Sequence, residues 1–464
     1  MNKQKKQFFI VLVLFVLIGN YAFAACTGSS PTWSCTYDST STQIQSCIDG
    51  ATAGDTINIG AGTSTWNTNI VITKAVNIIG AGIGQTIINS TYTHDFSSEL
   101  DTNSWLISIV PATPSDNPTI RISGMTINFG TGSTGILYWN TDYTAPVSEC
   151  TNVRFDHLSL YSPINYLFYR YGAAYGVMDN CIINGRINMG GEEELWTVSS
   201  YEFGTGSNFY FEDNTFTVES SSTVEMCAGN GANRYAWRYN TITTPTNVRT
   251  YPIFDLHGNQ NSVRASCFGA EIYNNTIIAN YDNSYTTAFI RQRGGKALVF
   301  NNTITWTTSG GLSAFVLEEH DDSEGPGAAT NAINGQPQHV SDSYYFGNTK
   351  NGSRLDVTED SDCCSAIDIN SEFWNENDSF NGTTGIGIGL VSGRPITCSV
   401  GVGYWDTNEN KLYRCESNNI WTAYYTPYTY PHPLRGTFKG ATIINTVGGL
   451  NAIDIVGGLN VINQ

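Results

Sequence analysis

The sequence predicts an all-β solenoid, a fold in which the chain winds into a stack of similar turns. Three observations favour this class: one short phrase recurs along the chain, apolar and polar residues alternate around it, and no long helical pattern accompanies it. In the phrase, Asn is followed by Thr or Cys between apolar residues. Its Asn residues are Asn180, Asn214, Asn240, Asn275, Asn302 and Asn348. The successive spacings of 34, 26, 35, 27 and 46 residues predict turns that each carry a loop of their own length.

Each copy of the phrase reads as a strand that ends at a corner. Between Phe209 and Phe216, for example, apolar and polar residues alternate, and β-branched and aromatic types are abundant. Asn tolerates the left-handed backbone conformation and can hydrogen-bond its own main chain, so it suits a turn. Where the same corner recurs in every turn, we expect the amides to stack as a ladder. Weaker copies at Val76, Ile120 and Val153 extend the solenoid to about residues 55 to 350.

The first 24 residues have the pattern of an export signal. Three lysines precede an apolar run, and residues 22–24 (Ala-Phe-Ala) form a small-x-small cleavage site. We expect the mature chain to begin at Ala25, and a second interpretation makes Cys26 a lipidated first residue. No other apolar stretch is long enough to cross a bilayer. The prediction is a secreted, periplasmic or cell-surface protein without membrane insertion after signal removal.

The charge balance excludes some partners. With a net charge of −18 and a pI near 4.6, the surface repels nucleic acid and anionic membranes. It also slows the approach of a polyanionic sugar, unless a basic patch or a bound cation offsets the repulsion, whereas neutral glycans suffer no such penalty. Charged residues make up only 13% of the chain, which is typical of large secreted β-proteins rather than of disordered ones.

Eleven cysteines in an exported chain permit disulfides. Cys398 with Cys415 is the first expected pair, because these residues close a short segment rich in Trp and Tyr, and Cys26 with Cys35 is the second. The odd number leaves at least one thiol free or paired outside the chain. Cys181 takes the place of the Thr in the other copies of the phrase and is expected to be a packing residue. No CxxC is present and His numbers six, so a metal cluster is not expected.

The N-terminal region carries a family resemblance. Residues 44–51 have the spacing of a short amphipathic helix, followed by GDTINIGAG from residue 54, VNIIGAG from residue 76 and GQTIIN from residue 84. These residues resemble the start of right-handed parallel β-helix proteins of the pectin-lyase-like superfamily, and the resemblance covers about residues 40 to 350. It implies a right-handed parallel β-helix whose first coil is covered by the helix, which protects an open sheet edge. It implies no activity, because the superfamily includes lyases, hydrolases, epimerases, adhesins and phage tailspikes.

The domain organisation follows from where the phrase stops. The expected segments are the signal peptide over 1–24, the capped β-helix over 25–350, a polar irregular segment that closes it over 351–395, a disulfide-pinned aromatic hairpin over 396–435 and a Gly-rich tail over 436–464. The hairpin is interpreted either as a lid over the last coil or as a carbohydrate-stacking surface.

Candidate catalytic residues are found when strands further along each turn are aligned by their distance in sequence from the ladder Asn. Three segments then align, beginning at Phe254, Ile290 and Leu317. If these residues point inward, period-two alternation directs the first and third residues after them outward, in two columns. The predicted catalytic residues are Asp255, Arg291 and Glu318 in one column and His257, Arg293 and His320 in the other. Stacked coils lie about 4.8 Å apart, so these ionisable groups are expected to be close neighbours.

Further candidates surround these columns. The expected substrate-binding residues are Glu225 on the turn before, Lys296, and Trp405 and Trp421 of the aromatic hairpin. The calcium candidates are Glu319, Asp321 and Asp322, whose oxygens suit calcium although EF-hand spacing is missing. No cofactor is required by the reactions considered, and calcium is the one ion for which ligands are present.

Two reactions fit the columns, and a structural interpretation competes with both. A β-elimination lyase needs a base beside a uronate and a cation that holds its carboxylate as the enolate forms. Arg291 or Arg293 would neutralise, while His257 or the other Arg would abstract the proton. A glycosidase needs two carboxylates about 5 to 9.5 Å apart, and Asp255 and Glu318 would lie two coils apart. Alternatively, charges of alternating sign on stacked strands form ion pairs that merely hold the coils in register.

The sequence departs from pectate lyases in ways that limit the resemblance. The stretch Asp156-His157 is similar to that family's Asp-His strand, but the Arg-x-Pro-x-x-Arg motif that supplies its catalytic Arg is absent. No catalytic residue is therefore carried over. Lys296 with Arg291 or Arg293 is similar to the Lys and Arg on stacked coils of chondroitinase-like and alginate-lyase-like β-helices, again without a diagnostic motif.

The sequence thus predicts a secreted protein that acts on an extracellular or cell-wall polysaccharide, as a lyase of the uronate type or as a glycoside hydrolase. The alternative is a noncatalytic adhesin or structural rod that binds glycans without cleaving them.

Overall fold

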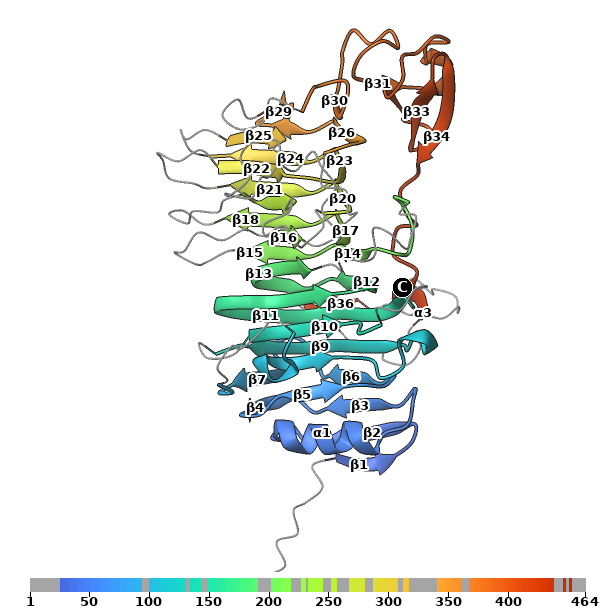
Figure 1. Cartoon of the computed structure of the whole chain (residues 1–464). Helices are drawn as coiled ribbons and strands as arrows, with labels where there is room; N and C mark the ends of the chain where they lie inside the picture. Colours follow the sequence, from blue (N-terminus) through green and yellow to red (C-terminus); the bar gives the residue numbers. More distant parts are fainter. Residues whose placement is uncertain are drawn as a thin grey trace, which may run out of the picture.

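The computed structural model is a parallel β-helix, in which the chain winds into a stack of coils (Figure 1). The structure describes residues 26–93, 100–130, 134–142, 148–190, 202–217, 227–230, 233–244, 252–256, 267–279, 287–307, 312–316, 340–359, 367–437, 445–447 and 450–452. Three parallel sheets form the wall of the stack, and we name them A, B and C in the order in which a coil visits them. The predicted fold class, an all-β solenoid with a short N-terminal helix and a C-terminal hairpin, is confirmed.

Sheet A precedes the corner at which the Asn residues lie. Its strands are β2 (Thr32–Cys35), β3 (Thr56–Ile59), β6 (Asn77–Gly80), the start of β9 (Ile120–Asn128), the start of β11 (Cys150–Tyr171), β12 (Ala174–Asp179), β14 (Phe209–Glu212), β17 (Arg234–Arg238), β20 (Gly269–Tyr273), β23 (Lys296–Phe300), β26 (Ser343–Phe346) and β30 (Phe373–Asn375). Neighbours in this series pair in parallel. Side chains at equivalent positions therefore form columns along the axis of the stack.

Sheets B and C complete each coil. Sheet B contains β4 (Gly62–Trp66), β7 (Thr86–Ser90), the end of β9, the middle of β11, the start of β13 (Ile182–Gly190), β15 (Thr215–Thr217), β18 (Thr241–Thr244), β21 (Thr276–Ala279), β24 (Thr303–Trp306) and β27 (Thr349–Lys350), which also pairs with β28 (Ser353–Arg354). Sheet C contains β5 (Ile70–Ile72), β8 (Trp105–Ile109), β10 (Thr134–Trp139), the ends of β11 and β13, β16 (Cys227–Asn230), β19 (Phe254–Leu256), β22 (Thr287–Gln292), β25 (Leu312–Val316) and β29 (Thr358–Glu359). Strands β9, β11 and β13 bend through corners and so belong to more than one sheet.

A buried amide ladder runs through the corner between sheets A and B. Its members are Asn214, Asn240, Asn275, Asn302 and Asn348. The Oδ1 atom of each later member accepts hydrogen bonds from the amide and from Nδ2 of the member before it, with Nδ2–Oδ1 distances of 3.1, 3.0, 2.9 and 2.8 Å. The stacking expected from the recurring phrase is therefore confirmed for these five residues.

The predicted first member of the ladder, Asn180, is wrong by one residue. Cys181 holds the ladder position, since its amide donates to Oδ1 of Asn214 at 2.9 Å and the next residue, Ile182, pairs with Thr215. Asn180 takes the preceding corner position, where φ is 53°. In the following coils that position is held by Asp213, Tyr239, Asn274 and Asn301, all at positive φ. The recurring phrase led to the wrong assignment of Asn180 because Asn suits both the left-handed corner position and the ladder position.

The N-terminal end of the stack is covered as predicted. Strand β1 (Cys26–Ser29) pairs antiparallel with β2, and helix α1 (Ser41–Gly50) follows. The helix begins with a capping box, in which the Thr40 side chain accepts from the Gln43 amide and the Gln43 side chain accepts from the Thr40 amide. Ile44 and Ile48 are buried on the side of the helix that faces the first coils.

The cysteines follow the prediction in part. Cys398 and Cys415 form the predicted disulfide. Cys26 is in disulfide contact with both Cys35 and Cys47, and one sulfur atom can form only one of these bonds. The Cα atoms of Cys26 and Cys47 are 6.4 Å apart, within the usual range for a disulfide, whereas those of Cys26 and Cys35 are only 3.9 Å apart. Cys26 with Cys47 is thus the better pair, and the expected Cys26–Cys35 bond has a strong competitor. Cys150, Cys181 and Cys267 are buried free cysteines.

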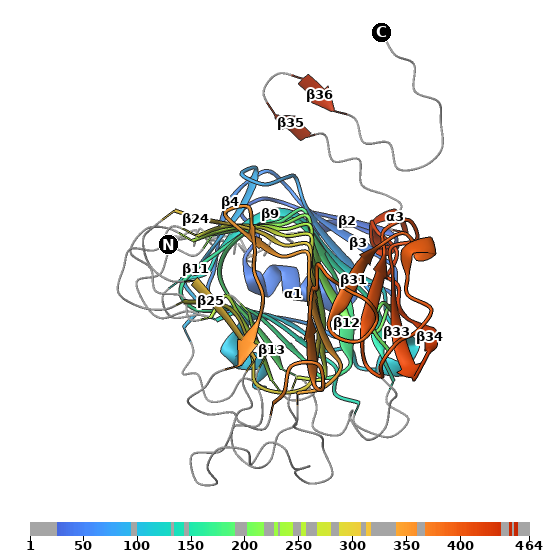
Figure 2. The ribbon, with the colours of Figure 1, turned by 90° about the horizontal axis from the view of Figure 1, so that it is seen from above.

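The C-terminal part packs against the outer side of sheet A. Strands β31 (Ile386–Gly389), β32 (Gly403–Asp406), β33 (Lys411–Ser417) and β34 (Ile420–Tyr425) form a small sheet beside the last coils (Figure 1). Residues 425–437, which we call the strap, then return along sheet A and end in α3 (Leu434–Thr437), as the view along the axis also shows (Figure 2).

Short elements complete the description. They are the 3₁₀-helices η1 (Thr102–Ser104), η2 (Pro114–Asp116) and η4 (Val391–Gly393), and the antiparallel pair β35 (Asn445–Val447) and β36 (Leu450–Ala452). Within the described parts of the chain, no helix combines the length and the apolar character that crossing a membrane requires.

Candidate functional site

The structure brings together three of the predicted catalytic residues on the outer side of sheet C. Phe254 on β19 pairs with Ile290 on β22, and Asp255 pairs with Arg291, as the alignment of their segments predicted. Phe254 and Ile290 are fully buried in the core of the stack, so the residues that follow them lie on the outer side. The sequence therefore predicted the register of these two strands correctly.

The charged groups at this position form an ion pair rather than an open row. Arg293 Nε lies 2.9 Å from Oδ1 of Asp255 and its Nη2 lies 2.6 Å from Oδ2, so both carboxylate oxygens are held by one guanidinium. Asp255 and Arg293 are both buried, whereas Arg291 is half-buried. Bidentate pairs of this kind are strong and geometrically specific. Arg291 is thus the least buried member of the group.

The third turn does not align as predicted. Arg291 pairs with Phe315 and Gln292 with Val316, so the position opposite Arg291 is not Glu318. A register shift between Ala288 and Arg291 accompanies this change. Counting residues from the ladder position gave the wrong alignment here, because the number of residues between the corner and sheet C differs from turn to turn.

The turn before differs for the same reason. Cys227 pairs with Phe254 and Ala228 with Asp255, so Glu225 does not stand beside Asp255, and Cys227 points into the core. The predicted residues that lie outside the described parts of the chain are Glu225, His257, Glu318, Glu319, His320, Asp321 and Asp322. They include all three calcium candidates.

The remaining substrate-binding candidates lie away from sheet C. Lys296 begins β23 on sheet A, where its Nζ lies 2.7 Å from Oδ2 of Asp342. Trp405 is buried, with its ring centroid 5.0 Å from that of Phe300 and 5.2 Å from that of Phe346. Its contacts are those of a packing residue that fixes the C-terminal sheet to the last coils, and they leave no open ring face for a sugar.

Trp421 has a different environment from Trp405. It is half-buried, its Nε1 donates to the Pro395 carbonyl at 2.8 Å, and the Arg394 guanidinium lies 5.4 Å from its ring centroid. A protein group thus already occupies the space over this ring. The aromatic hairpin lies against the side of sheet A, so neither a lid on the end of the stack nor a continuous stacking surface describes it fully.

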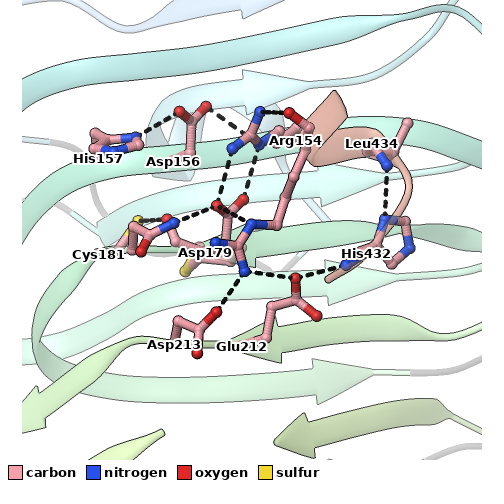
Figure 3. Close-up of polar contacts among 12 residues, drawn as sticks. Arg154, Asp156, His157, Asp179, Cys181, Glu212, Asp213, His432 and Leu434 are labelled. Carbon is pink, nitrogen blue, oxygen red and sulfur yellow. Dashed lines mark hydrogen bonds and ion pairs between the residues drawn. The ribbon is translucent and has the colours of Figure 1, made fainter. Parts of the chain in front are cut away.

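A second cluster of ionisable groups, which the sequence did not predict as a site, lies on sheet A (Figure 3). Arg121 holds Asp156 through two hydrogen bonds of 2.7 Å, and Nδ1 of His157 lies 2.8 Å from the same carboxylate. On the next coil, Arg154 holds Asp179 at 2.8 and 2.9 Å. His157 has the most exposed side chain of these five residues, about a third accessible.

The strap closes this cluster from outside. Arg435 lies 3.4 Å from Asp179 and 3.1 Å from Glu212, and it also contacts Asp213. The backbone amide of His432 donates to Glu212 at 2.9 Å. One coil further along, Arg238 donates to two strap carbonyls at 2.6 and 2.9 Å. Because the strap forms ion pairs and hydrogen bonds with these side chains, the cluster attaches the C-terminal segment to the β-helix.

Burial and ion pairing shift the pKa values of Asp156 and Asp179 in opposite directions. Burial alone would raise the pKa of Asp156, but hydrogen bonds from Arg121 and His157 hold it well below its ordinary value. At Asp179 burial prevails, and the pKa is raised although Arg154 bonds the carboxylate. Neither group is a poised catalytic acid, since both are enclosed by guanidinium groups.

The pKa of His432 in the strap is strongly shifted by the groups around it. Burial, reinforced by the nearby guanidinium groups of Arg238, Arg154 and Arg435, lowers the pKa of His432 to about 3. Its Nδ1 accepts a hydrogen bond of 3.2 Å from the Leu434 amide, which suits a neutral ring. Docking of the strap is therefore tied to an uncharged His432.

A sequence signal for the sheet A cluster exists in hindsight. Asp156, Asp179, Glu212 and Arg238 each lie two residues before the ladder position of their coil. Outward charges at that position in four consecutive coils indicate a covered, ion-paired face. The covering segment itself is 190 or more residues away in sequence, so the phrase could not reveal it.

Comparisons with known proteins add little to this picture. No family model matches the chain, and no curated protein sequence matches it. Among solved structures, the chain is similar to an alginate lyase from a Paenibacillus species, with 10% identity, 72% of this chain and 99% of that chain covered, and a TM-score of 0.40. It is also similar to tailspike protein 3 of bacteriophage CBA120, with 12% identity, 84% and 67% covered, and a TM-score of 0.27. At these values the likeness carries no functional argument, and the fold assignment depends on the strand pairing.

Proposed function

We propose that the protein acts on an extracellular polysaccharide at the outer side of sheet C, with Arg291 as the group that receives the polymer. The observation that carries this proposal is the half-buried Arg291 beside the buried Asp255–Arg293 pair, on two adjacent coils of a rigid stack. An arginine guanidinium has donors in a geometry that matches a carboxylate. In a chain of net charge −18, such a cation is what a polyanionic sugar needs for its approach.

β-Elimination is the reaction that these groups support first. Arg291 would hold the uronate carboxylate and stabilise the enolate as the neighbouring proton leaves. Asp255 would keep Arg293 in place, and His257 remains the candidate base. Hydrolysis is the second choice because it needs two available carboxylates, and both oxygens of Asp255 already accept from Arg293.

The test is cleavage of uronate polymers, followed by the ultraviolet absorbance of unsaturated products. Arg291→Ala and His257→Ala, made separately, are expected to abolish the signal without lowering the melting temperature. Arg354→Ala is the matched control, because Arg354 forms exposed ion pairs with Asp356 and Asp378 away from this position. Loss of the signal in the control, or full activity in Arg291→Ala, would contradict the proposal.

A noncatalytic rod that binds glycans is the second candidate function. It is favoured by the enclosure of Asp255, since a carboxylate that is buried and held by both oxygens is suited to fixing coils in register. Absence of cleavage across a broad panel of acidic and neutral glycans, together with retained binding to one of them, would favour the rod over the enzyme.

Three finer assignments belong to the same proposal. We infer membership of the right-handed pectin-lyase-like superfamily, export by residues 1–24, and activity without a cofactor, with calcium as the one ion to be tested. Sequencing the N-terminus of the protein from culture medium tests the export signal, because a start at Ala25 is expected. Activity measured with and without a chelator tests calcium.

A further inference from the structure

The outer side of sheet B carries two regular columns of uncharged residues. The first column contains Thr63, Ile87, Thr126, Ser159, Ile182, Thr215, Thr241, Thr276, Thr303 and Thr349. The second contains Thr65, Asn89, Asn128, Tyr161, Asn184, Thr217, Thr243, Ile278 and Thr305. None of these residues is charged, and most of them are threonines. We call the surface that they form the threonine face.

The columns point outward because the residues between them point inward. Leu160, Ile183, Phe216, Ile242 and Ile277 lie between the two columns and are buried in the core of the stack. Neighbours within a column are about 4.8 Å apart and neighbours along a strand about 7 Å apart, so the side chains form a flat lattice. Branching at Cβ restricts χ1 of Thr and Ile, and a ligand would therefore immobilise few additional rotamers on this surface.

The threonine face is open to solvent along the described coils. Thr215, Thr276 and Thr303 are exposed, and no strand or strap lies over them in the described part of the chain. Two larger groups stand on adjacent strands of the same lattice: the side chain of Tyr161 is 39% exposed and that of Ile182 is 49% exposed. An exposed aromatic ring beside rows of hydroxyl groups provides both an apolar platform and hydrogen-bonding partners.

The lack of charge selects the kind of partner. A polyanion is repelled by an acidic chain unless cations receive it, and the two columns contain no Lys or Arg. A basic partner would find no carboxylate there. A neutral polymer meets no such penalty, and its hydroxyl groups can exchange hydrogen bonds with Thr and Asn side chains, which both donate and accept.

The dimensions of the threonine face indicate an extended ligand. The first column crosses ten paired strands, β4 to β27, which at about 4.8 Å each gives about 43 Å. The spacing is regular along the axis, and the first column is threonine in every coil from Thr215 to Thr349, so successive units of a linear polymer would meet the same group over these coils. A compact small molecule would use only a small part of this regular surface.

We propose that the threonine face is an anchoring track for a neutral, linear polysaccharide that lies along the axis of the β-helix. This inference goes beyond the proposed function, because the track lies on sheet B, needs no reaction and recognises uncharged sugars. A protein with both features would hold a neutral polymer with sheet B while sheet C acts on an acidic one.

The test is retention on insoluble neutral polymers, microcrystalline cellulose and chitin, measured by co-sedimentation of the full chain. Retention of the wild-type protein on at least one polymer is expected, and the double variant Thr241→Glu/Thr276→Glu is expected to bind at least tenfold more weakly. Both substitutions are on the solvent side of exposed strands, so the melting temperature is expected to stay unchanged. Thr422→Glu, on the exposed outer strand β34, is the matched control with full retention.

Several results would overturn the track. They are no retention on either neutral polymer, equal retention of the double variant, or retention that soluble alginate or polygalacturonate abolishes while neutral oligosaccharides have no effect. Dimerisation of the wild-type protein that is lost in the double variant would assign the threonine face to a second copy instead. Arg291→Ala should leave retention intact, so failure of the sheet C proposal and failure of the track are distinguishable.

Discussion

Two outer faces of the same coils, only three residues apart along the chain, have opposite chemistry. On sheet A, the column Asp156, Asp179, Glu212 and Arg238 is charged and buried, and the strap contacts its last three members. On sheet B, the column Ser159, Ile182, Thr215 and Thr241 is uncharged, with Ile182 and Thr215 exposed and Ser159 and Thr241 half-buried. The corner between them turns the chain, so neighbouring residues in sequence face different surroundings. The difference teaches that the charged column of sheet A marks a surface with a partner inside the chain.

The physical reason lies in the cost of burying charge. A carboxylate or guanidinium that is covered must be paired and hydrogen-bonded, because desolvation otherwise disfavours it by several kcal/mol. The strap supplies this pairing through the Arg435 side chain. Backbone groups of the strap also bond the side chains of Glu212 and Arg238. The threonine face has no covering segment among the described residues and carries no groups that would need one.

The largest expected effect is the loss of a buried charge on sheet A. Asp156→Ala leaves the buried Arg121 guanidinium without its bidentate partner, which is expected to lower the free energy of unfolding by about 3 to 5 kcal/mol. Denaturant unfolding with the wild-type protein as reference measures it. A loss below about 1 kcal/mol would show that the sheet A network contributes little, and the contrast between the two faces would fail.

The ladder beneath both faces is expected to be the next most sensitive feature. Asn275→Ala removes an acceptor for Asn240 and a donor to the Trp237 carbonyl and to Asn302, all buried. Groups left without partners are expected to cost about 2 kcal/mol or more. Asn418→Ala, on an exposed turn, serves as the control and is expected to change stability by less than about 0.5 kcal/mol. Equal effects of the two substitutions would argue against the ladder.

Acidification is expected to weaken the sheet A side through His432. The unfolded chain protonates this ring below about pH 6.5, whereas the folded chain keeps it neutral down to about pH 3. The unfolded state binds the extra proton in this window, so stability falls as pH is lowered, by up to about 1.4 kcal/mol per pH unit. Thermal unfolding between pH 7 and 5, where few carboxyl groups titrate, measures this slope, and His432→Phe should flatten it. An unchanged slope in the variant would assign the pH dependence elsewhere.

The smallest effect is expected on sheet B. Thr241→Val keeps the branched shape and removes one partly exposed hydroxyl group, so the free energy of unfolding should change by less than about 0.5 kcal/mol. The same denaturant titration used for Asp156→Ala provides the value under matched conditions. A loss above 2 kcal/mol would show that Thr241 is structural, and the threonine face would then need no ligand to explain it.

The sequence revealed what repeats and missed what does not. The phrase and the period-two pattern predicted the stack, the ladder from Asn214 onward and the pairing of Asp255 with Arg291, because these depend on local chemistry repeated in each coil. Asn180 was assigned to the ladder position, although it occupies the corner position one residue earlier, because Asn suits both positions. Glu318 was aligned wrongly because turn lengths vary between coils.

The strap network was beyond the reach of sequence reasoning for another reason. Arg435 and Glu212 are far apart in the chain, and no sequence pattern around either residue predicts their contact. Trp405 and Trp421 illustrate the same limit, since an aromatic run predicts a contact surface without telling whether a sugar or the protein covers it. Only the fold shows that Trp405 packs on Phe300.

The most direct test of the contrast between the faces is hydroxyl-radical footprinting of two tyrosines in one folded sample. Tyr161 stands on the threonine face and is 39% exposed, whereas Tyr210 lies outward on sheet A, is fully buried and packs 5.1 Å from the His432 ring of the strap. We predict that Tyr161 is oxidised at least tenfold faster than Tyr210. Similar oxidation rates for the two rings would contradict the account.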